Sequence, residues 1–393
     1  MYSLIKLKPG KEHSLKRHHP WVFSGAINQQ AKDILPGDTV EIQSYNGQYL
    51  GHGHYADGSI AVRIFSFTGY DASSSFWLHK LESAYALREK CGLVNNAETN
   101  IYRLVHAEGD GMPGLVVDIY GDTAVLQSHS AGMHHVKSFL CEALQKIYGS
   151  RLKNIFDKSA AKLKQNTGKE IENTYLSGSL TGNIAWEHGH RFLIDWEEGQ
   201  KTGFFIDQRE NRKLLAQYSK DKKVLNTFCY TGGFSVYALK ADAMLVHSLD
   251  SSQRALDITT ENIKLNKLDE QRHACIKADA VEYLKNLQED YDIIVLDPPA
   301  FAKNISARHK AMQGYTRINE AAIRQIKKGG IIFTFSCSQA VNKEQFAGCV
   351  TAAAIHAGRD VRILHQLHQP ADHPVSMFHP EGEYLKGLVI EVT

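Results

Sequence analysis

Two short segments carry residue types that can do covalent chemistry on a nucleic acid base. Cys337 follows the apolar run GIIFTFS, and Asp297 ends the run DIIVLD directly before two prolines. A thiolate that adds to C6 of a cytosine makes C5 able to attack the methyl group of a sulfonium cofactor, and loss of the C5 proton then expels the thiol. A carboxylate near N3 would stabilise the charge that builds on the ring. We therefore predict that Cys337 and Asp297 are catalytic.

The other cysteines give no such signal. A lone cysteine is usually a small buried hydrophobe, and Cys229 and Cys275 are expected to be of this kind. The six cysteines are widely scattered without a CxxC pair, which argues against a zinc knuckle or a redox motif. We therefore predict no metal site.

The loop after Asp297 is predicted to bind the target base. Its first proline restricts Asp297 to extended geometry, and both prolines remove backbone donors, so the loop should be stiff. The carboxylate would meet the ring nitrogen or exocyclic amine while an aromatic ring stacks on the base. The predicted substrate contacts are Pro298, Pro299 and Phe301. The alternative is a plain turn at the end of a strand.

Cys337 and Asp297 can act on one base only if a sheet brings the ends of their two strands together. After residue 215, continuous apolar runs alternate with helical segments, which is typical of βαβ crossovers in a buried, mostly parallel sheet. The fold class is thus α/β, and the last two strands are expected to close as a hairpin at the sheet edge. The predicted strands lie near 222–226, 243–249, 272–276, 292–297, 330–336, 361–367 and 387–392. Ligands bind such sheets beyond the carboxyl ends of the strands.

The segments before this sheet have a different character. Short β-like runs broken by turn signals predict a small β-barrel-like module over 1–72. A helix over 76–92 opens an α+β middle domain, 73–188, and the α/β domain takes 189–393.

A cofactor site is predicted at the first strands of the sheet. The first strand enters a turn with Gly232 and Gly233, and a helix N-terminus that offers free N–H groups follows. The full GxGxxG pattern is absent, so a dinucleotide is disfavoured. Asp250 ends the second strand, where an acid can accept hydrogen bonds from ribose hydroxyls. Asp279 and Ala280 follow the third strand and could meet an adenine edge. Together these features indicate a nucleoside-containing cofactor.

Local basic patches are the candidates for RNA contact. The chain has 45 basic and 43 acidic side chains, so it is no polycation overall. Residues 301–330 hold seven Lys or Arg and one Glu, directly after the base loop. The predicted RNA contacts in this stretch are Arg308, Lys310, Tyr315 and Arg317. A solvated helix face is the alternative. A second basic set near the N-terminus comprises Lys6, Lys8, Lys11, Lys16 and Arg17, with Trp21.

The chain shows no apolar run long enough to span a membrane and no signal peptide. With few cysteines as well, we expect a cytoplasmic protein, in which a thiol stays reduced.

The motifs together resemble the 23S ribosomal RNA cytosine-5 methyltransferases that carry an N-terminal PUA domain, the large-subunit methyltransferase I type. LKRHHPWVFSGAI (15–27) is similar to the PUA signature, and RLVHAEGDGMPGLVVDIYGD (103–122) to the middle domain. FLIDWEEGQKTGFFIDQRENR (192–212) resembles the linker hairpin that enters the catalytic domain. NTFCYTGGFS, LDPPAF and FTFSCS resemble the cofactor, base-binding and nucleophile motifs. The match runs through essentially the whole chain.

The resemblance implies a Rossmann-like class I methyltransferase domain with seven strands, S-adenosyl-L-methionine as cofactor and 23S ribosomal RNA as partner. It implies that Cys337 is the nucleophile and that a hairpin over 201–209 lies on the cofactor. The cofactor residues it implies are Asn226, Phe228, Tyr230, Thr231, Gly232, Gly233, Asp250, Asp279 and Ala280, with Asp207, Gln208 and Arg209 near the methionine end. Ala300 stands where a second RNA cytosine-5 family has another cysteine, so the base for the elimination stays unassigned.

Two other functions stay open at this level. An amino-group RNA methyltransferase would grip an exocyclic amine with LDPPAF and need no cysteine, and a non-catalytic RNA-binding protein would keep only a vestigial cofactor domain. The sequence leaves open the target nucleotide, the choice between free RNA and an assembly intermediate, and the oligomeric state, a homodimer included.

Overall fold

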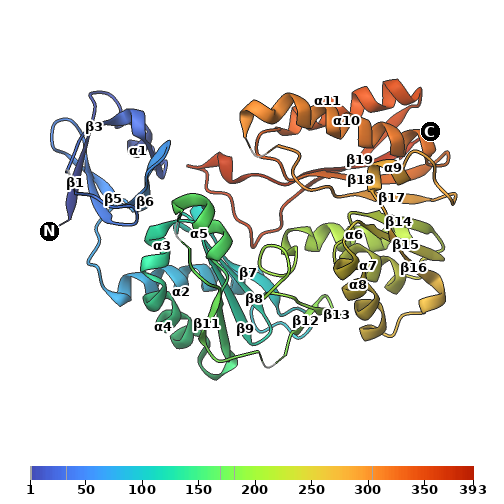
Figure 1. Cartoon of the computed structure of the whole chain (residues 1–393), viewed down its shortest axis with the longest axis horizontal. Helices are drawn as coiled ribbons and strands as arrows, with labels where there is room; N and C mark the ends of the chain where they lie inside the picture. Colours follow the sequence, from blue (N-terminus) through green and yellow to red (C-terminus); the bar gives the residue numbers. More distant parts are fainter. Residues whose placement is uncertain (1, 32, 169, 181, 303) are drawn as a thin grey trace. The chain divides into compact units, whose positions relative to one another are not determined.

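The computed structural model describes residues 2–31, 33–168, 170–180, 182–302 and 304–393, which form two compact units (Figure 1). The first unit holds the chain up to residue 186 together with 194–206 and 371–382. The second holds 187–193, 207–370 and 383–393. The sequence placed both 194–206 and 371–382 in the C-terminal domain, whereas the structure assigns them to the first unit.

The first unit begins with a six-stranded sheet in the order β2-β6-β5-β4-β1-β3. Alternate residues of β4 are buried, as expected for a strand with one face on a core. The core is made by Ile5, Leu7, Val40, Ile42 and Val62, among others. The elements are β1 (Ser3–Leu7), α1 (His13–Lys16), β2 (Trp21–Phe23), β3 (Ile27–Gln30), β4 (Thr39–Gln43), β5 (Tyr49–Tyr55) and β6 (Ile60–Ser66). The predicted β-module is confirmed.

A five-stranded sheet in the order β11-β10-β9-β8-β7 follows in the same unit. Helix α2 begins two residues before the predicted helix over 76–92 and buries Trp77 and Leu81 in a core shared with α4. The elements are α2 (Ser74–Lys90), β7 (Ile101–His106), β8 (Leu115–Tyr120), β9 (Thr123–Ser128), α3 (Ala131–His135), α4 (Lys137–Tyr148), β10 (Asn154–Asp157), α5 (Ala160–Thr167) and β11 (Thr174–Ser177).

The hairpin lies earlier than the sequence predicted. Strands β12 (Ile184–Glu187) and β13 (His190–Leu193) form a two-stranded sheet. The two residues between them, His188 and Gly189, have φ of 48° and 74°. Positive φ at both central positions is the geometry of a tight hairpin turn. The expected hairpin at 201–209 is replaced by a 3₁₀ turn, Ile206–Gln208, and the start of α6 at Arg209.

The second unit is built on a seven-stranded sheet in the order β16-β15-β14-β17-β18-β20-β19. All neighbours pair in parallel except β20, which is antiparallel to both β18 and β19. This confirms the α/β class I methyltransferase fold and the hairpin-like edge. The strands are β14 (Lys223–Thr227), β15 (Leu245–Asp250), β16 (His273–Lys277), β17 (Ile293–Leu296), β18 (Gly330–Ser336), β19 (Val361–His368) and β20 (Lys386–Val392).

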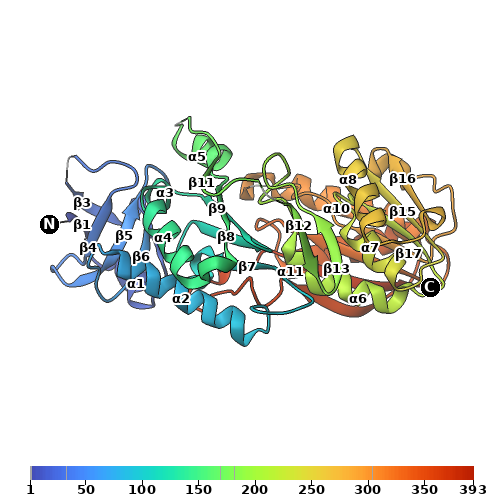
Figure 2. The ribbon, with the colours of Figure 1, turned by 90° about the horizontal axis from the view of Figure 1, so that it is seen from below.

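Helices cover both faces of this sheet (Figures 1 and 2). One face carries α9, α10 and α11, whose apolar side chains share a core with the strands. The other carries α6, α7 and α8. Their bounds are α6 (Arg209–Ser219), α7 (Gly233–Lys240), α8 (Gln253–Leu265), α9 (Ala280–Tyr283), α10 (Arg308–Gln325) and α11 (Lys343–Ala357). Within the described ranges, no helix has the length and apolarity that a membrane span needs.

Parallel neighbours end at a common edge. The central strands β15, β14, β17 and β18 run side by side, so the segments after Asp250, Thr227, Leu296 and Ser336 meet at the carboxyl edge. The sheet therefore brings together the motifs that the sequence singled out.

Candidate active site

The turn between β14 and α7 has an unusual backbone. Phe228, Tyr230 and Gly232 have φ of 54°, 48° and 77°. Left-handed conformations cost a side chain free energy and persist where surrounding contacts enforce them, often at ligand sites. A Cβ on Gly232 would lie 2.5 Å from Cγ2 of Thr259, so glycine is also required for space.

Helix α8 holds this turn through two polar side chains that the sequence analysis missed. The Thr259 hydroxyl donates to the carbonyl of Tyr230 (3.0 Å), and the Asn262 amide donates to the carbonyl of Thr231 (2.8 Å). Both side chains are fully buried. The helix directly after Asp250 is amphipathic, and these two polar residues lie on its buried face. Polar residues at core positions of that helix are the sequence signal that could have found them.

Asp250 fixes the turn from the adjacent strand. Its Oδ2 accepts the backbone N–H of Tyr230 (3.0 Å), and its Oδ1 accepts that of Ser252 (2.9 Å). Each carboxylate oxygen has a second lone pair. The carboxylate is therefore oriented by the backbone and still able to accept hydrogen bonds from ribose hydroxyls.

The remaining predicted cofactor residues divide into two kinds. Asp279 is exposed and caps α9 by accepting the N–H of Glu282 (3.0 Å), while Ala280 is buried behind it. Asn226 is buried in β14, and its amide donates to Ser235 (2.9 Å), so it supports the turn from inside the sheet. The buried Thr231 hydroxyl has no hydrogen-bond partner among the residues described. A strained glycine turn, an oriented acid and an orphan hydroxyl fit a nucleoside-containing cofactor.

The segment before α6 reaches the Asp297 carboxylate. The Gln208 amide donates to Oδ2 of Asp297 (3.0 Å), and the Tyr384 hydroxyl donates to Asp207 (2.7 Å). Arg209 is buried, and its Nε lies 3.1 Å from Glu210. The sequence grouped the three residues 207–209 at the methionine end of the cofactor, and in the structure Gln208 also bonds to Asp297, directly before the predicted base loop.

The base loop and the Cys337 segment are joined by a hydrogen bond. The Ser338 hydroxyl donates to the carbonyl of Ala302 (2.8 Å). The Cys337 side chain is half-buried at the end of β18, and Asp297 is half-buried at the end of the adjacent β17. The structure therefore brings the predicted thiol and carboxylate to neighbouring strand ends, with Pro298 buried and Pro299 exposed.

Phe301 and Tyr315 differ from expectation. Tyr315 is fully buried, so it is not a surface contact for RNA. Its ring lies 4.7 Å from that of Phe301, and a Cβ on Gly314 would come within 2.9 Å of the Phe301 ring. Phe301 is thus packed on α10, which leaves only part of its ring for a base. Burial raises the pKa of Tyr315 to about 12, which keeps the phenol neutral.

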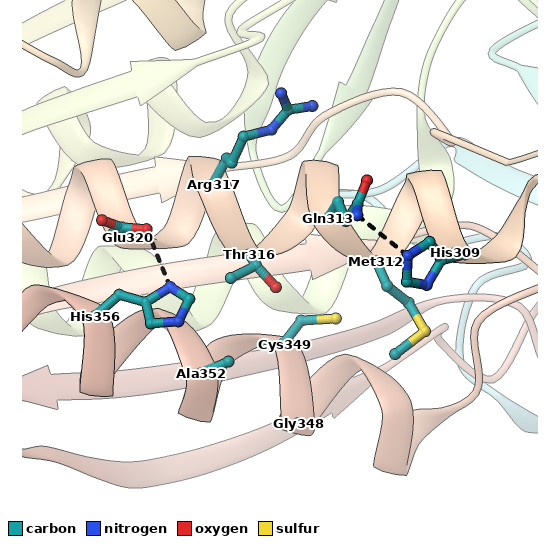
Figure 3. Close-up of a pocket in the computed structure, with 10 residues that line it drawn as sticks. All are labelled: His309, Met312, Gln313, Thr316, Arg317, Glu320, Gly348, Cys349, Ala352 and His356. Carbon is teal, nitrogen blue, oxygen red and sulfur yellow. Dashed lines mark hydrogen bonds and ion pairs between the residues drawn. The ribbon is translucent and has the colours of Figure 1, made fainter.

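The predicted basic contacts on α10 differ in their exposure. Arg308 is half-buried, whereas Lys310 and Arg317 are exposed. Arg317 lines a groove of about 500 Å³ between α10 and α11, where His356 pairs with Glu320 (3.3 Å) and Gln313 bonds His309 (3.1 Å) (Figure 3). Cys337 and Asp297 do not line this groove. Arg317 is therefore associated with the outer helices and not with the base loop.

In the first unit, Trp21 is held within a polar cluster. Its indole N–H donates to Glu108 (2.9 Å), and its ring packs on His379 at 4.4 Å. His19 Nδ1 accepts the backbone N–H of Trp21 (3.2 Å), which places the ring proton on Nε2, 3.5 Å from Glu381. In this neutral tautomer the Nε2–H of His19 faces Glu381, and His19, His379 and Glu381 lie close together.

Comparison with known proteins agrees with this geometry. A PUA-like domain model matches residues 5–67, and an S-adenosylmethionine-dependent methyltransferase model matches residues 165–376. The chain is 38% identical to the ribosomal RNA large subunit methyltransferase I of Escherichia coli strains SMS-3-5 and K12, over 99% of each chain. A solved structure described as a SAM-dependent methyltransferase from Streptococcus mutans shares the fold, with a TM-score of 0.85 and 21% identity over 99% of each chain. The chain therefore belongs to the ribosomal RNA large subunit methyltransferase I family and is an S-adenosylmethionine-dependent methyltransferase with an N-terminal PUA-like domain.

Proposed function

We propose that this enzyme forms 5-methylcytosine in 23S ribosomal RNA through a covalent adduct between Cys337 and C6 of the target cytosine. The observation that carries the proposal is the placement of Cys337 and Asp297 at the ends of the paired parallel strands β18 and β17. The Ser338–Ala302 hydrogen bond joins the segments that bear them. The printed name of the E. coli relatives supports an RNA of the large ribosomal subunit as substrate.

The residues would act in sequence on one base. The Cys337 sulfur forms a bond to C6, and the electron pair of the C5–C6 double bond becomes available at C5. Asp297, with its carboxyl group protonated, would donate a hydrogen bond to N3 and so stabilise the negative charge that the addition places on the ring. The Gly232 turn and Asp250 would hold S-adenosylmethionine, which would supply the methyl group to C5 and become S-adenosylhomocysteine. Transfer of the C5 proton to a base, which the sequence leaves unassigned, restores the double bond and expels the Cys337 thiolate.

The target base must leave its stack to reach this edge of the sheet. We propose that the PUA-like domain and the exposed Lys310 contact the RNA backbone, which gives binding a steep dependence on salt. The thiol mechanism requires a reduced cysteine, so a cytoplasmic location belongs to the same proposal.

Replacement of Cys337 tests the mechanism. Cys337→Ala should lose transfer of labelled methyl groups to ribosomal RNA while retaining S-adenosylhomocysteine binding by calorimetry. Cys275→Ala is the matched control, because Cys275 lies in β16, away from the reaction edge, and should stay active. Wild-type enzyme should form a covalent adduct with 5-fluorocytidine RNA, since fluorine cannot leave as a proton does.

The product distinguishes the alternatives. An active Cys337→Ala enzyme that yields N4-methylcytidine would replace the thiol mechanism with amino-group methylation by the Asp297 loop. A wild-type chain that binds neither S-adenosylmethionine nor S-adenosylhomocysteine would indicate a non-catalytic RNA-binding protein.

A further inference from the structure

Lys386 is a buried lysine next to the predicted nucleophile. It is the first residue of β20, and in the β18–β20 pairing its Cα lies opposite Ser336, which directly precedes Cys337. Only 5% of the residue is exposed. A lysine is seldom this buried unless its ammonium is paired.

The Lys386 ammonium is bound to the segment that follows Cys337. Its Nζ donates to the carbonyl of Ser338 (2.6 Å) and to that of Val341 (2.7 Å). An ammonium has three donors, so one remains after these two bonds. The β20 backbone is also tightly seated here, because a Cβ on Gly387 would lie 2.5 Å from the Phe335 ring. The side chain therefore fixes both ends of the 338–341 turn.

Among the charged or titratable groups around Lys386, Cys337 has the largest effect on the ammonium. Three charged or titratable groups act on the ammonium: Cys337 from β18, Glu383 from the segment before β20 and Lys343 from the start of α11. Glu383 is paired with Lys343. In the described part of the chain, no carboxylate comes within ion-pairing distance of Lys386. Burial lowers the pKa of Lys386 to about 8, and Cys337 acts in the opposite direction, so the ammonium persists at neutral pH.

We propose that Lys386 is a positioning residue that orients the Cys337 segment and stabilises the thiolate of Cys337 as its buried counter-charge. This inference rests on the proposed role of Cys337 as nucleophile. A nearby cation favours the thiolate, which is the attacking form of cysteine. The same charge would assist the final step, when the C6–S bond breaks and its electron pair leaves on sulfur.

The pH dependence of Cys337 alkylation tests the proposal. The full chain is treated with iodoacetamide at a series of pH values, and mass spectrometry reads the peptide that contains Cys337. In the wild type, the midpoint should lie at least one pH unit below that of a free cysteine peptide. Lys386→Gln keeps an amide donor but removes the charge, so the midpoint should rise by about one unit and the rate at pH 7 should fall about tenfold. Lys386→Arg should keep the low midpoint.

Lys328→Gln is the matched control, because it removes an exposed cation that is not among the groups acting on Lys386. Its midpoint should match the wild type. A wild-type midpoint equal to that of the free peptide would overturn the proposal. This test uses the wild-type protein alone, so it does not depend on the folding of a variant. The proposal is also overturned by an unchanged midpoint in Lys386→Gln. Retained methylation by Cys337→Ala would instead refute the proposed mechanism, since alkylation is measured without turnover.

Discussion

The side-chain amide of Gln208 donates a hydrogen bond to the carboxylate of Asp297, with Nε2 and Oδ2 3.0 Å apart. The amide is itself oriented by Asn211, whose Nδ2 donates to Oε1 of Gln208 at 2.6 Å. Gln208 and Asn211 are both buried. A chain of two amides thus runs from α6 to the carboxylate that we predict to face the base.

Loss of this amide should slow methyl transfer. Gln208→Ala removes one hydrogen bond that orients Asp297, and a catalytic group displaced by about 1 Å can cost up to about a hundredfold in rate. Gln208→Glu should be slower still, because it sets a second carboxylate beside the first. Single-turnover methylation of ribosomal RNA measures both. Gln288→Ala, which removes an exposed glutamine bonded only to the carbonyl of Asn286, should behave as wild type. An unimpaired Gln208→Ala would show that Asp297 needs no orientation.

Gly232→Ala should weaken cofactor binding. The alanine would have to adopt a φ of 77°, and its Cβ would collide with Thr259. The left-handed conformation alone costs about 1–2 kcal/mol, so we expect at least about a tenfold rise in the Kd for S-adenosylhomocysteine, measured by calorimetry. Gly358→Ala is the control, because its φ is 67° but nothing lies within 4 Å of the added Cβ. Equal affinities for Gly232→Ala and wild type would contradict the role of this turn.

The buried ion pair between Arg212 and Glu187 should be essential for the second unit. Nε and Nη2 of Arg212 donate to the two carboxylate oxygens of Glu187 at 2.8 and 2.7 Å, and both side chains are buried. Glu187→Ala would leave a buried charge without its partner, which costs about 3–5 kcal/mol. The stability of the second unit is measured by hydrogen exchange of peptides from β14, which belongs to it. Glu282→Ala breaks an exposed pair with Lys285 and should change stability by less than about 1 kcal/mol. Equal hydrogen-exchange protection of β14 in Glu187→Ala and Glu282→Ala would show that the buried pair is not essential.

His54 should make the first unit sensitive to acid. Burial lowers the pKa of His54 to about 3. Between pH 6.5 and 3 the unfolded chain therefore binds more protons at this residue than the folded one, so stability falls as the pH falls through this window. Each pH unit contributes about 1.4 kcal/mol.

Urea unfolding at pH 7 and pH 4.5 measures this effect. Tryptophan fluorescence is specific to the first unit, because Trp21, Trp77, Trp186 and Trp196 all belong to it. His54→Gln should lose less stability on acidification than wild type, by about 2–3 kcal/mol. His79→Gln, which removes an exposed histidine, should lose as much stability between pH 7 and pH 4.5 as wild type. The same loss in His54→Gln and wild type would place the acid sensitivity elsewhere.

The hairpin and the RNA-contact residues show where local patterns were insufficient. The dipeptide His188-Gly189 is a local turn signal. The family resemblance instead predicted the hairpin within 192–212, where the chain enters helix α6. Tyr315 sits in a basic stretch that suggests an exposed face, yet helical spacing places it among the apolar side chains of α10. Burial of one residue in a helix depends on the neighbour that covers it, here Phe301.

The sequence by itself determined the fold of the second unit and the sheet edge at which the predicted site residues lie. Apolar runs alternating with helices dictate a parallel sheet, and parallel strands must present their carboxyl ends together, so Asp250, Asp297 and Cys337 could be placed without coordinates. Only the tertiary structure decided which side chains support them. Lys386 meets the Cys337 segment because β20 inserts between β18 and β19, and Gln208 meets Asp297 because α6 begins beside the base loop. Such contacts join residues far apart in the chain, and strand order and helix placement bring them together in ways that no local spacing encodes.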